Sequence, residues 1–88
     1  MAATYPLQIV THEETVYSGE VESLIAPGAL GYLGILAHHA PLLTPLTEGT
    51  ITIRDAQEET KTYWVKGGIL EVANSEAVIL AENIGGVG

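Results

Sequence analysis

Cysteine is absent from this sequence, and basic residues are scarce. Three lysines and arginines stand against eleven aspartates and glutamates, which gives a formal charge of −8. Without cysteine, disulfides and thiolate metal sites are excluded, and the chain suits a reducing compartment. The negative charge repels nucleic acid and anionic lipid headgroups, so we expect neither nucleic-acid binding nor direct membrane insertion. The acidic excess serves solubility or, alternatively, matches a partner with basic loops.

Long apolar runs are also missing. The run Val78-Ile79-Leu80-Ala81 is typical, and it falls far short of the ~20 residues that a membrane-spanning helix needs. The first residues show neither the basic nor the apolar region of a secretory signal. Hydrophobic residues nevertheless make up 47% of the 88 residues, too many for a disordered segment. The sequence therefore predicts one small folded domain.

The hydrophobic pattern is that of strands, and no long amphipathic helical pattern is present. Apolar residues alternate with polar ones in residues 7–9, 51–53 and 70–72, and residues 20–26 and 60–66 are apolar on both sides. Turn-forming residues separate these segments at 11–14, 18–19, 27–28, 55–59, 67–68 and 73–75. The pattern predicts an all-β sandwich or barrel of short antiparallel strands.

Two boundaries are predicted from glycine. Gly67 and Gly68 lack side chains, so we expect them to form a sharp corner between two strands. The last strand should end near Glu82. We take residues 1–84 as the folded domain and residues 85–88 as a flexible glycine-rich tail.

The glycines at 28, 31 and 34 do not read as a phosphate-binding loop. Such a loop lies between a strand and a helix and continues into Lys-Ser or Lys-Thr, whereas here Pro41 interrupts the next segment. Glycines at this spacing more often supply turns with positive φ angles. We therefore expect no nucleotide site here.

The remaining polar groups do not form a recognisable catalytic set. His38 and His39 are adjacent, so on an extended chain their side chains point apart and do not share a metal ion. The acidic pairs at 13–14 and 58–59 fall in predicted turns, where carboxylates are solvated. No serine has a nucleophile-elbow pattern. The sequence predicts a non-catalytic interaction domain without metal or cofactor.

Two motifs carry a resemblance to a known family. Residues 31–49 read GYLGILAHHAPLLTPLTEG, residues 67–72 read GGILEV, and residues 78–82 read VILAE. These stretches resemble the signature of the epsilon subunit of F-type ATP synthases, and the likeness extends over residues 4–82. The family fold is a flattened β-sandwich of about ten short strands, which agrees with the pattern described above.

The resemblance implies a mechanical role. A chain of this family is expected to sit in the central stalk, at the cytoplasmic side of the energy-transducing membrane and peripheral to it. In bacteria this membrane is the plasma membrane. There it would couple ion-driven rotation to ATP synthesis and be a monomer when isolated. The expected contacts with the gamma subunit are Thr11, His39 and Thr44. Those with the polar loops of the c-ring are Gly28, Gly31, Tyr32 and Leu33.

The sequence departs from the family at three points. Tyr32 stands where family members often have an acidic residue, and Ala37-His38 replaces a common Pro-Gly. The family usually continues into a C-terminal helical hairpin that can inhibit hydrolysis, whereas this sequence stops at Gly88. Its glycine-rich end has no helix N-cap signal, which favours a naturally short, non-inhibitory subunit. The rival interpretation is a free-standing adaptor or ligand-binding β-domain.

Overall fold

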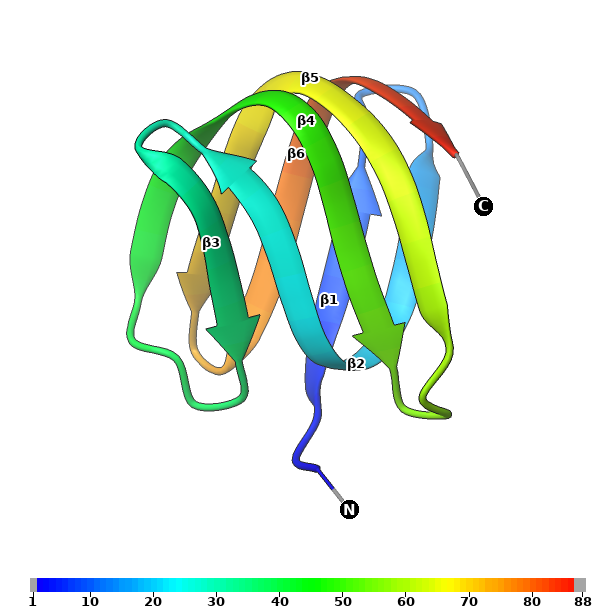
Figure 1. Cartoon of the computed structure of the whole chain (residues 1–88), viewed down its shortest axis with the longest axis vertical. Coiled ribbons are helices and arrows are strands. Elements are labelled where there is room, and N and C mark those ends of the chain that lie inside the picture. The colour runs from blue at the N-terminus through cyan, green and yellow to red at the C-terminus, as the bar shows by residue number, and fades with distance from the viewer. Residues whose placement is uncertain (1, 87–88) are drawn as a thin grey trace.

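The computed structural model describes residues 2–86 and contains six strands there. Their bounds are β1 Tyr5–Val10, β2 Thr15–Gly28, β3 Gly31–Leu36, β4 Leu42–Asp55, β5 Thr60–Ala73 and β6 Glu76–Gly86. The described residues include no helix, and therefore none that could cross a membrane. The all-β prediction is confirmed (Figure 1).

The strands form one sheet that closes on itself. Their order is β1-β6-β5-β4-β2-β3, and β1 also pairs with β2, so that β3 is added at the edge of β2 (Figure 1). Strands β1 and β6 run parallel, whereas the other pairs are antiparallel. The prediction of a purely antiparallel sandwich is therefore wrong at this one pair. The closed ring of β1, β6, β5, β4 and β2 has an odd number of strands, so at least one neighbouring pair must be parallel.

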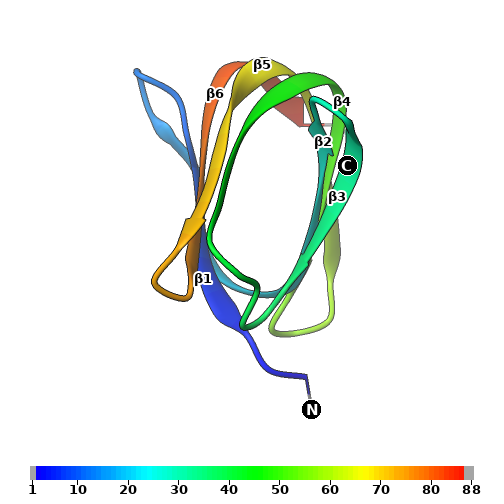
Figure 2. The same cartoon turned by 90° about the vertical axis from the view of Figure 1, so that its left-hand side faces the viewer.

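The expected count of about ten short strands is also not met. The closed sheet is flattened into two layers, and several long strands run through both of them. Strands β2, β4 and β5 each have 14 residues, a length of about 46 Å at ~3.3 Å per residue. The longest dimension of the molecule is 32 Å. These strands must therefore bend, and Figure 2 shows β4, β5 and β6 passing over one end from one layer to the other.

The glycine corner lies within a strand instead of between two strands. Gly67 and Gly68 have φ angles of 81° and 142°, yet the pairing of β5 with β4 and β6 keeps the same register on both sides of them. These conformations let β5 turn sharply without breaking its ladders. In Figure 1 this part of β5 is yellow and forms the crest of the fold.

Two other segments that were predicted to end strands also lie inside strand ladders. Ser18 and Gly19 were expected in a turn, but they pair with Gln8 and Leu7 inside the β1–β2 ladder. Strand β6 continues past Glu82, and Gly85 and Gly86 pair with Trp64 and Tyr63. The domain boundary at residue 84 is therefore too early, because backbone ladder bonds need no side chains. Residues 87–88 of the predicted tail lie outside the described residues.

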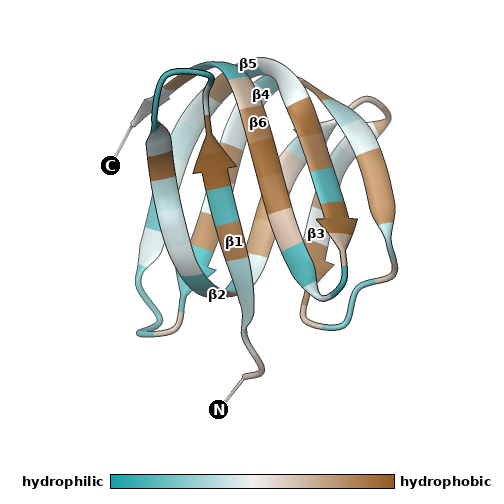
Figure 3. Ribbon diagram, turned by 180° about the vertical axis from the view of Figure 1, so that it is seen from behind, coloured by the Kyte–Doolittle hydropathy of each residue, from teal (hydrophilic) through white to brown (hydrophobic). Residues whose placement is uncertain are grey.

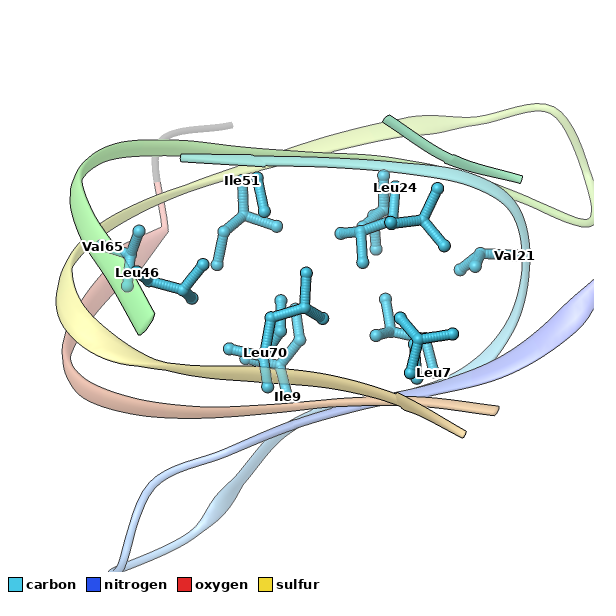
Figure 4. Packing of buried hydrophobic residues seen from close by; sticks show 14 of the residues in the cluster. Leu7, Ile9, Val21, Leu24, Leu46, Ile51, Val65 and Leu70 are labelled. Atoms are coloured by element: carbon cyan, nitrogen blue, oxygen red, sulfur yellow. The ribbon is translucent and has the colours of Figure 1, made fainter. Parts of the chain in front are cut away.

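The core fills the space between the two layers. Figure 4 shows Leu24 and Ile51 from one layer facing Leu7 and Leu70 from the other, with Leu46 and Val65 at one end. Leu7, Leu24, Ile51, Val65 and Leu70 have no exposed surface. This agrees with the period-two pattern, because every second residue of each strand points inward.

Tyr5 adds a polar link across the interior. Its hydroxyl donates a hydrogen bond of 2.7 Å to the backbone carbonyl of Ile35, which joins β1 to β3. Burial raises the pKa of Tyr5 well above its ordinary value of 10.0. The fold therefore favours the neutral phenol. This contribution to stability is complete below pH 10 and is lost as the pH rises from there toward the folded pKa.

Replacing Tyr5 by phenylalanine tests this link. We expect Tyr5→Phe to cost about 1 kcal/mol of unfolding free energy at neutral pH, because the hydrogen bond is lost while the ring remains. We also expect the variant to lose less stability than the parent between about pH 9 and about pH 11. Urea unfolding at a series of pH values measures both effects. Parallel curves for the two proteins would contradict the assignment.

Candidate interaction surface

Two charged residues at the end of β4 make contacts that stabilise the fold. Asp55 is buried, and its carboxylate accepts hydrogen bonds from the backbone N–H groups of Gln57 and Glu59, each at 2.9 Å. These bonds shape the turn between β4 and β5. Arg54 pairs with Glu58 at 2.8 Å and with Glu22 at 3.4 Å. Residues 2–86 hold no group of three or more side chains placed to bind a metal ion.

The four residues predicted to meet the c-ring lie together at one hairpin. Gly28 ends β2 and Gly31 begins β3, and the two are opposite each other across a two-residue turn. Gly31 has a φ angle of 129°, which favours glycine. A side chain at Gly28 would come within 2.9 Å of the Leu33 side chain. Gly28 is buried, so its role is to let Leu33 lie across it.

The residue that projects furthest from this hairpin is one that the sequence interpretation missed. Leu30 lies in the turn and has a relative exposure of 103%. A large apolar side chain in a turn between two glycines was the available signal. Tyr32, in contrast, lies back against the sheet, where its hydroxyl accepts a hydrogen bond of 3.1 Å from the N–H of Thr50. This hydrogen bond lowers the pKa of Tyr32.

The three residues predicted to meet gamma lie in two different loops and in strand β4. Thr11 follows β1, and its hydroxyl accepts bonds from the N–H groups of Glu13 and Glu14 at 3.2 and 3.1 Å. It therefore shapes the β1–β2 loop. His39 is in the β3–β4 loop, and these two loops lie at opposite ends of the molecule (Figure 1). The predicted residues do not form a compact cluster.

His39 and Thr44 each make a local hydrogen bond. The Nδ1 of His39 lies 2.7 Å from the carbonyl oxygen of Ala40, so it donates a proton there and Nε2 is the neutral ring's acceptor. The half-buried hydroxyl of Thr44 donates to the carbonyl of Pro45 at 3.2 Å. Thr44 pairs with the buried Leu70. Its side chain is therefore on the inner side of β4, and the neighbours of Thr44 point outward.

An exposed apolar strip crosses four neighbouring strands of one layer. Pro45, Ile69, Leu80 and Val10 occupy one row across β4, β5, β6 and β1, and Leu43 lies in a parallel row on β4. All are exposed or half-exposed. The layer that carries them faces the viewer in Figure 3, where hydrophobic residues colour much of β1 and β6. The adjacent leucines at 42 and 43 were the available signal, because neighbours on a strand cannot both point inward.

The sequence was compared with known protein families and curated relatives. Residues 4–85 match the family described as the ATP synthase delta/epsilon chain beta-sandwich domain. The ATP synthase epsilon chain of Desulforamulus reducens is 48% identical over 82 residues, which are 93% of this chain and 61% of that one. The epsilon chain of Moorella thermoacetica is 44% identical over 80 residues, which are 91% of this chain and 60% of that one. The chain thus spans about three fifths of the length of these relatives.

Solved structures share the fold. A chain in the mitochondrial ATP synthase of Euglena gracilis, solved with its F1 and c-ring, superimposes with a TM-score of 0.89 at 18% identity. The match covers 98% of this chain and 55% of that one. A chain from the central stalk and c-ring of the Tetrahymena thermophila enzyme gives a TM-score of 0.76 at 16% identity, over 94% of this chain and 66% of that one. At these identities the likeness concerns the fold alone.

Proposed function

Because the chain belongs to the ATP synthase delta/epsilon beta-sandwich family, we propose that it is a non-catalytic rotor component of an F-type ATP synthase. In this role it binds the gamma subunit and the polar loops of the c-ring. It holds the two together so that ion-driven rotation of the ring turns gamma. It sits on the cytoplasmic side of a bacterial plasma membrane, without inserting into it. The observation that carries the proposal is the family match over residues 4–85.

Two separate surfaces support this role. Covering the apolar strip on the β1-β6-β5-β4 layer would remove hydrophobic surface from water, which is favourable and suits a lasting contact with gamma. The β2–β3 hairpin lies on another part of the molecule and projects Leu30. We assign this hairpin to the c-ring. A connector between two bodies needs two such surfaces.

The closed sheet suits a component that transmits torque. Its long strands cross from one layer to the other, so both layers are joined by backbone ladders as well as by a close-packed core. Packed protein interiors have low compressibility and transmit strain. A force applied at the hairpin is therefore carried to the opposite layer with little internal yielding.

Reconstitution tests the proposed role directly. A rotary complex of catalytic head, gamma and c-ring is assembled in vesicles with and without the 88-residue chain, and ATP hydrolysis and proton pumping are measured. We expect the chain to bind gamma in a pull-down and to raise pumping per ATP hydrolysed. We expect it not to suppress hydrolysis. Failure to bind gamma would refute the proposal, and strong inhibition relieved by ATP would show that the sandwich itself acts as a brake.

His39 offers a test at the edge of the gamma surface. We expect His39→Glu to weaken gamma binding by about 1–3 kcal/mol, because it removes an imidazole acceptor and adds a charge at a contact that excludes water. Gln57→Glu is the matched control, since it also adds a negative charge to an exposed loop residue but lies in the β4–β5 turn, away from the residues assigned to gamma. Calorimetric titration with gamma measures both variants. An unchanged affinity for His39→Glu would remove His39 from the interface.

A further inference from the structure

The charged residues of this chain avoid one continuous segment. No aspartate, glutamate, lysine or arginine occurs between Glu22 and Glu48, although fourteen such residues occur elsewhere. The segment comprises the second half of β2, the hairpin turn, β3, the β3–β4 loop and the start of β4. Its large exposed hydrophobic side chains are Ile25, Leu30, Tyr32, Leu36 and Leu43. Residues 23–47 therefore offer a partner no charged side chain for an ion pair, apart from the histidines at 38 and 39.

The hairpin is held against the neighbouring strand by Tyr32. The phenol of Tyr32 reaches over β2 to β4, where it accepts the N–H of Thr50. A side chain at Gly49 would collide with the Tyr32 hydroxyl and would lie 2.9 Å from Pro27. The absence of a side chain at Gly49 thus leaves room for the Tyr32 hydroxyl. The Tyr32 side chain therefore links β3 to β4 across β2, in addition to the backbone ladders.

From these observations we propose that the hairpin meets the c-ring through an uncharged, apolar contact led by Leu30, with Tyr32 as a positioning residue. This inference rests on the proposed function and specifies the chemistry of one of its contacts. The occupant is an uncharged part of the c-ring loops. Two features favour this occupant. Leu30 lies in the turn between Gly28 and Gly31, which are assigned to that contact, and residues 23–47 contain no acidic residue, lysine or arginine. An apolar contact of this kind is insensitive to salt, unlike an ionic one.

The salt dependence of binding tests the contact. The chain is bound to gamma, and the affinity of this pair for detergent-solubilised c-ring is measured from about 50 to about 500 mM salt. We expect the affinity to stay within about twofold over this range. Leu30→Asp should weaken binding about tenfold or more, because an apolar contact is lost and a charge is buried. Leu36→Asp, at the far end of β3 from the turn, should leave the affinity unchanged.

A double-mutant cycle tests the positioning role of Tyr32. We expect Gly49→Ala to weaken c-ring binding several-fold while gamma affinity is unchanged, because the new methyl group displaces the Tyr32 hydroxyl from Thr50. In a Tyr32→Ser background, Gly49→Ala should cause a much smaller further loss of c-ring affinity. Tyr32→Phe removes the hydroxyl that accepts the Thr50 N–H and should weaken c-ring binding about as much as Gly49→Ala does. Strictly additive effects of the two changes would contradict the positioning role.

The outcomes separate this inference from the function on which it rests. A c-ring affinity that falls steeply with salt, or one that Leu30→Asp leaves unchanged, would overturn the apolar contact while the rotor role stands. The same applies if gamma binds but the hairpin instead joins two copies of this chain, as light scattering would reveal. Loss of gamma binding by the unchanged chain would refute the proposed function itself.

Discussion

Gly68→Ala should be among the most destabilising single substitutions in this domain. A methyl group at this position would collide with the backbone carbonyl of Leu80 and would lie 3.0 Å from the Cα of Ala81. Both neighbours are held in the β5–β6 ladder, so they cannot move aside as a flexible side chain could. The φ angle of 142° adds strain for any residue except glycine.

The two costs, about 1–3 kcal/mol for backbone strain and about 1–3 kcal/mol for overpacking, act together. Their combination is a large share of the ~5–15 kcal/mol that stabilises a typical domain. Urea unfolding should therefore show a midpoint lowered by a large fraction, or no folded state at all.

Gly34→Ala is the control for Gly68→Ala. Gly34 lies in β3, its φ angle is not positive, and nothing lies within 4 Å of the position that its Cβ would take. We expect a change of at most about 0.5 kcal/mol, in the stabilising direction, since alanine loses less backbone entropy than glycine. If Gly68→Ala unfolded at the same urea concentration as Gly34→Ala, the corner in β5 would not require a glycine.

Ile69→Asp should cause the largest loss of gamma binding. Ile69 lies in the middle of the apolar strip, between Pro45 and Leu80, and is 46% exposed. Aspartate at this point would place an unpaired charge at the centre of a dry contact, where truncating changes have their largest effects. We expect the affinity for gamma to fall about a hundredfold or more, equivalent to about 3 kcal/mol.

Ile25→Asp is a closely matched control. Ile25 is 44% exposed, points outward from a strand as Ile69 does, and lies where β2 pairs with β3 and β4, away from the strip. This substitution should leave gamma affinity unchanged, and urea unfolding of both variants checks that both remain folded. Equal losses for the two aspartates would show that the strip is not the gamma surface. A loss for Ile25→Asp alone would move that surface to the other layer.

Local patterns were sufficient for strand positions but not for strand continuity. The alternation around residues 7–9, 51–53 and 70–72 placed core side chains correctly, because each strand has one buried face. The same reasoning made Gly67-Gly68 a break between strands, whereas the ladders of β5 continue through it. A glycine pair looks alike in sequence whether it ends a strand or bends one. Only the partners on both sides decide which occurs.

One candidate surface could be found from the sequence, and the other could not. The hairpin residues at 28, 31, 32 and 33 were found together because they are neighbours in sequence and a turn keeps them so. The apolar strip brings together Leu43, Ile69, Leu80 and Val10 from four strands. Only Leu43, beside Leu42, stands out in its own segment. Their adjacency is created by the register between strands that are far apart in the chain.

The sequence by itself determined the all-β class, the positions of most turns and the family, because these depend on local periodicity, turn chemistry and motifs. The tertiary structure decided that residues 2–86 form six strands where about ten were expected, and that β1 runs parallel to β6. It also decided that Tyr32 lies back over Gly49 while Leu30 projects. The physical reason is closure. Closing the sheet into a ring fixes strand direction, register and bending at once, and each of these depends on contacts between residues that are distant in the chain.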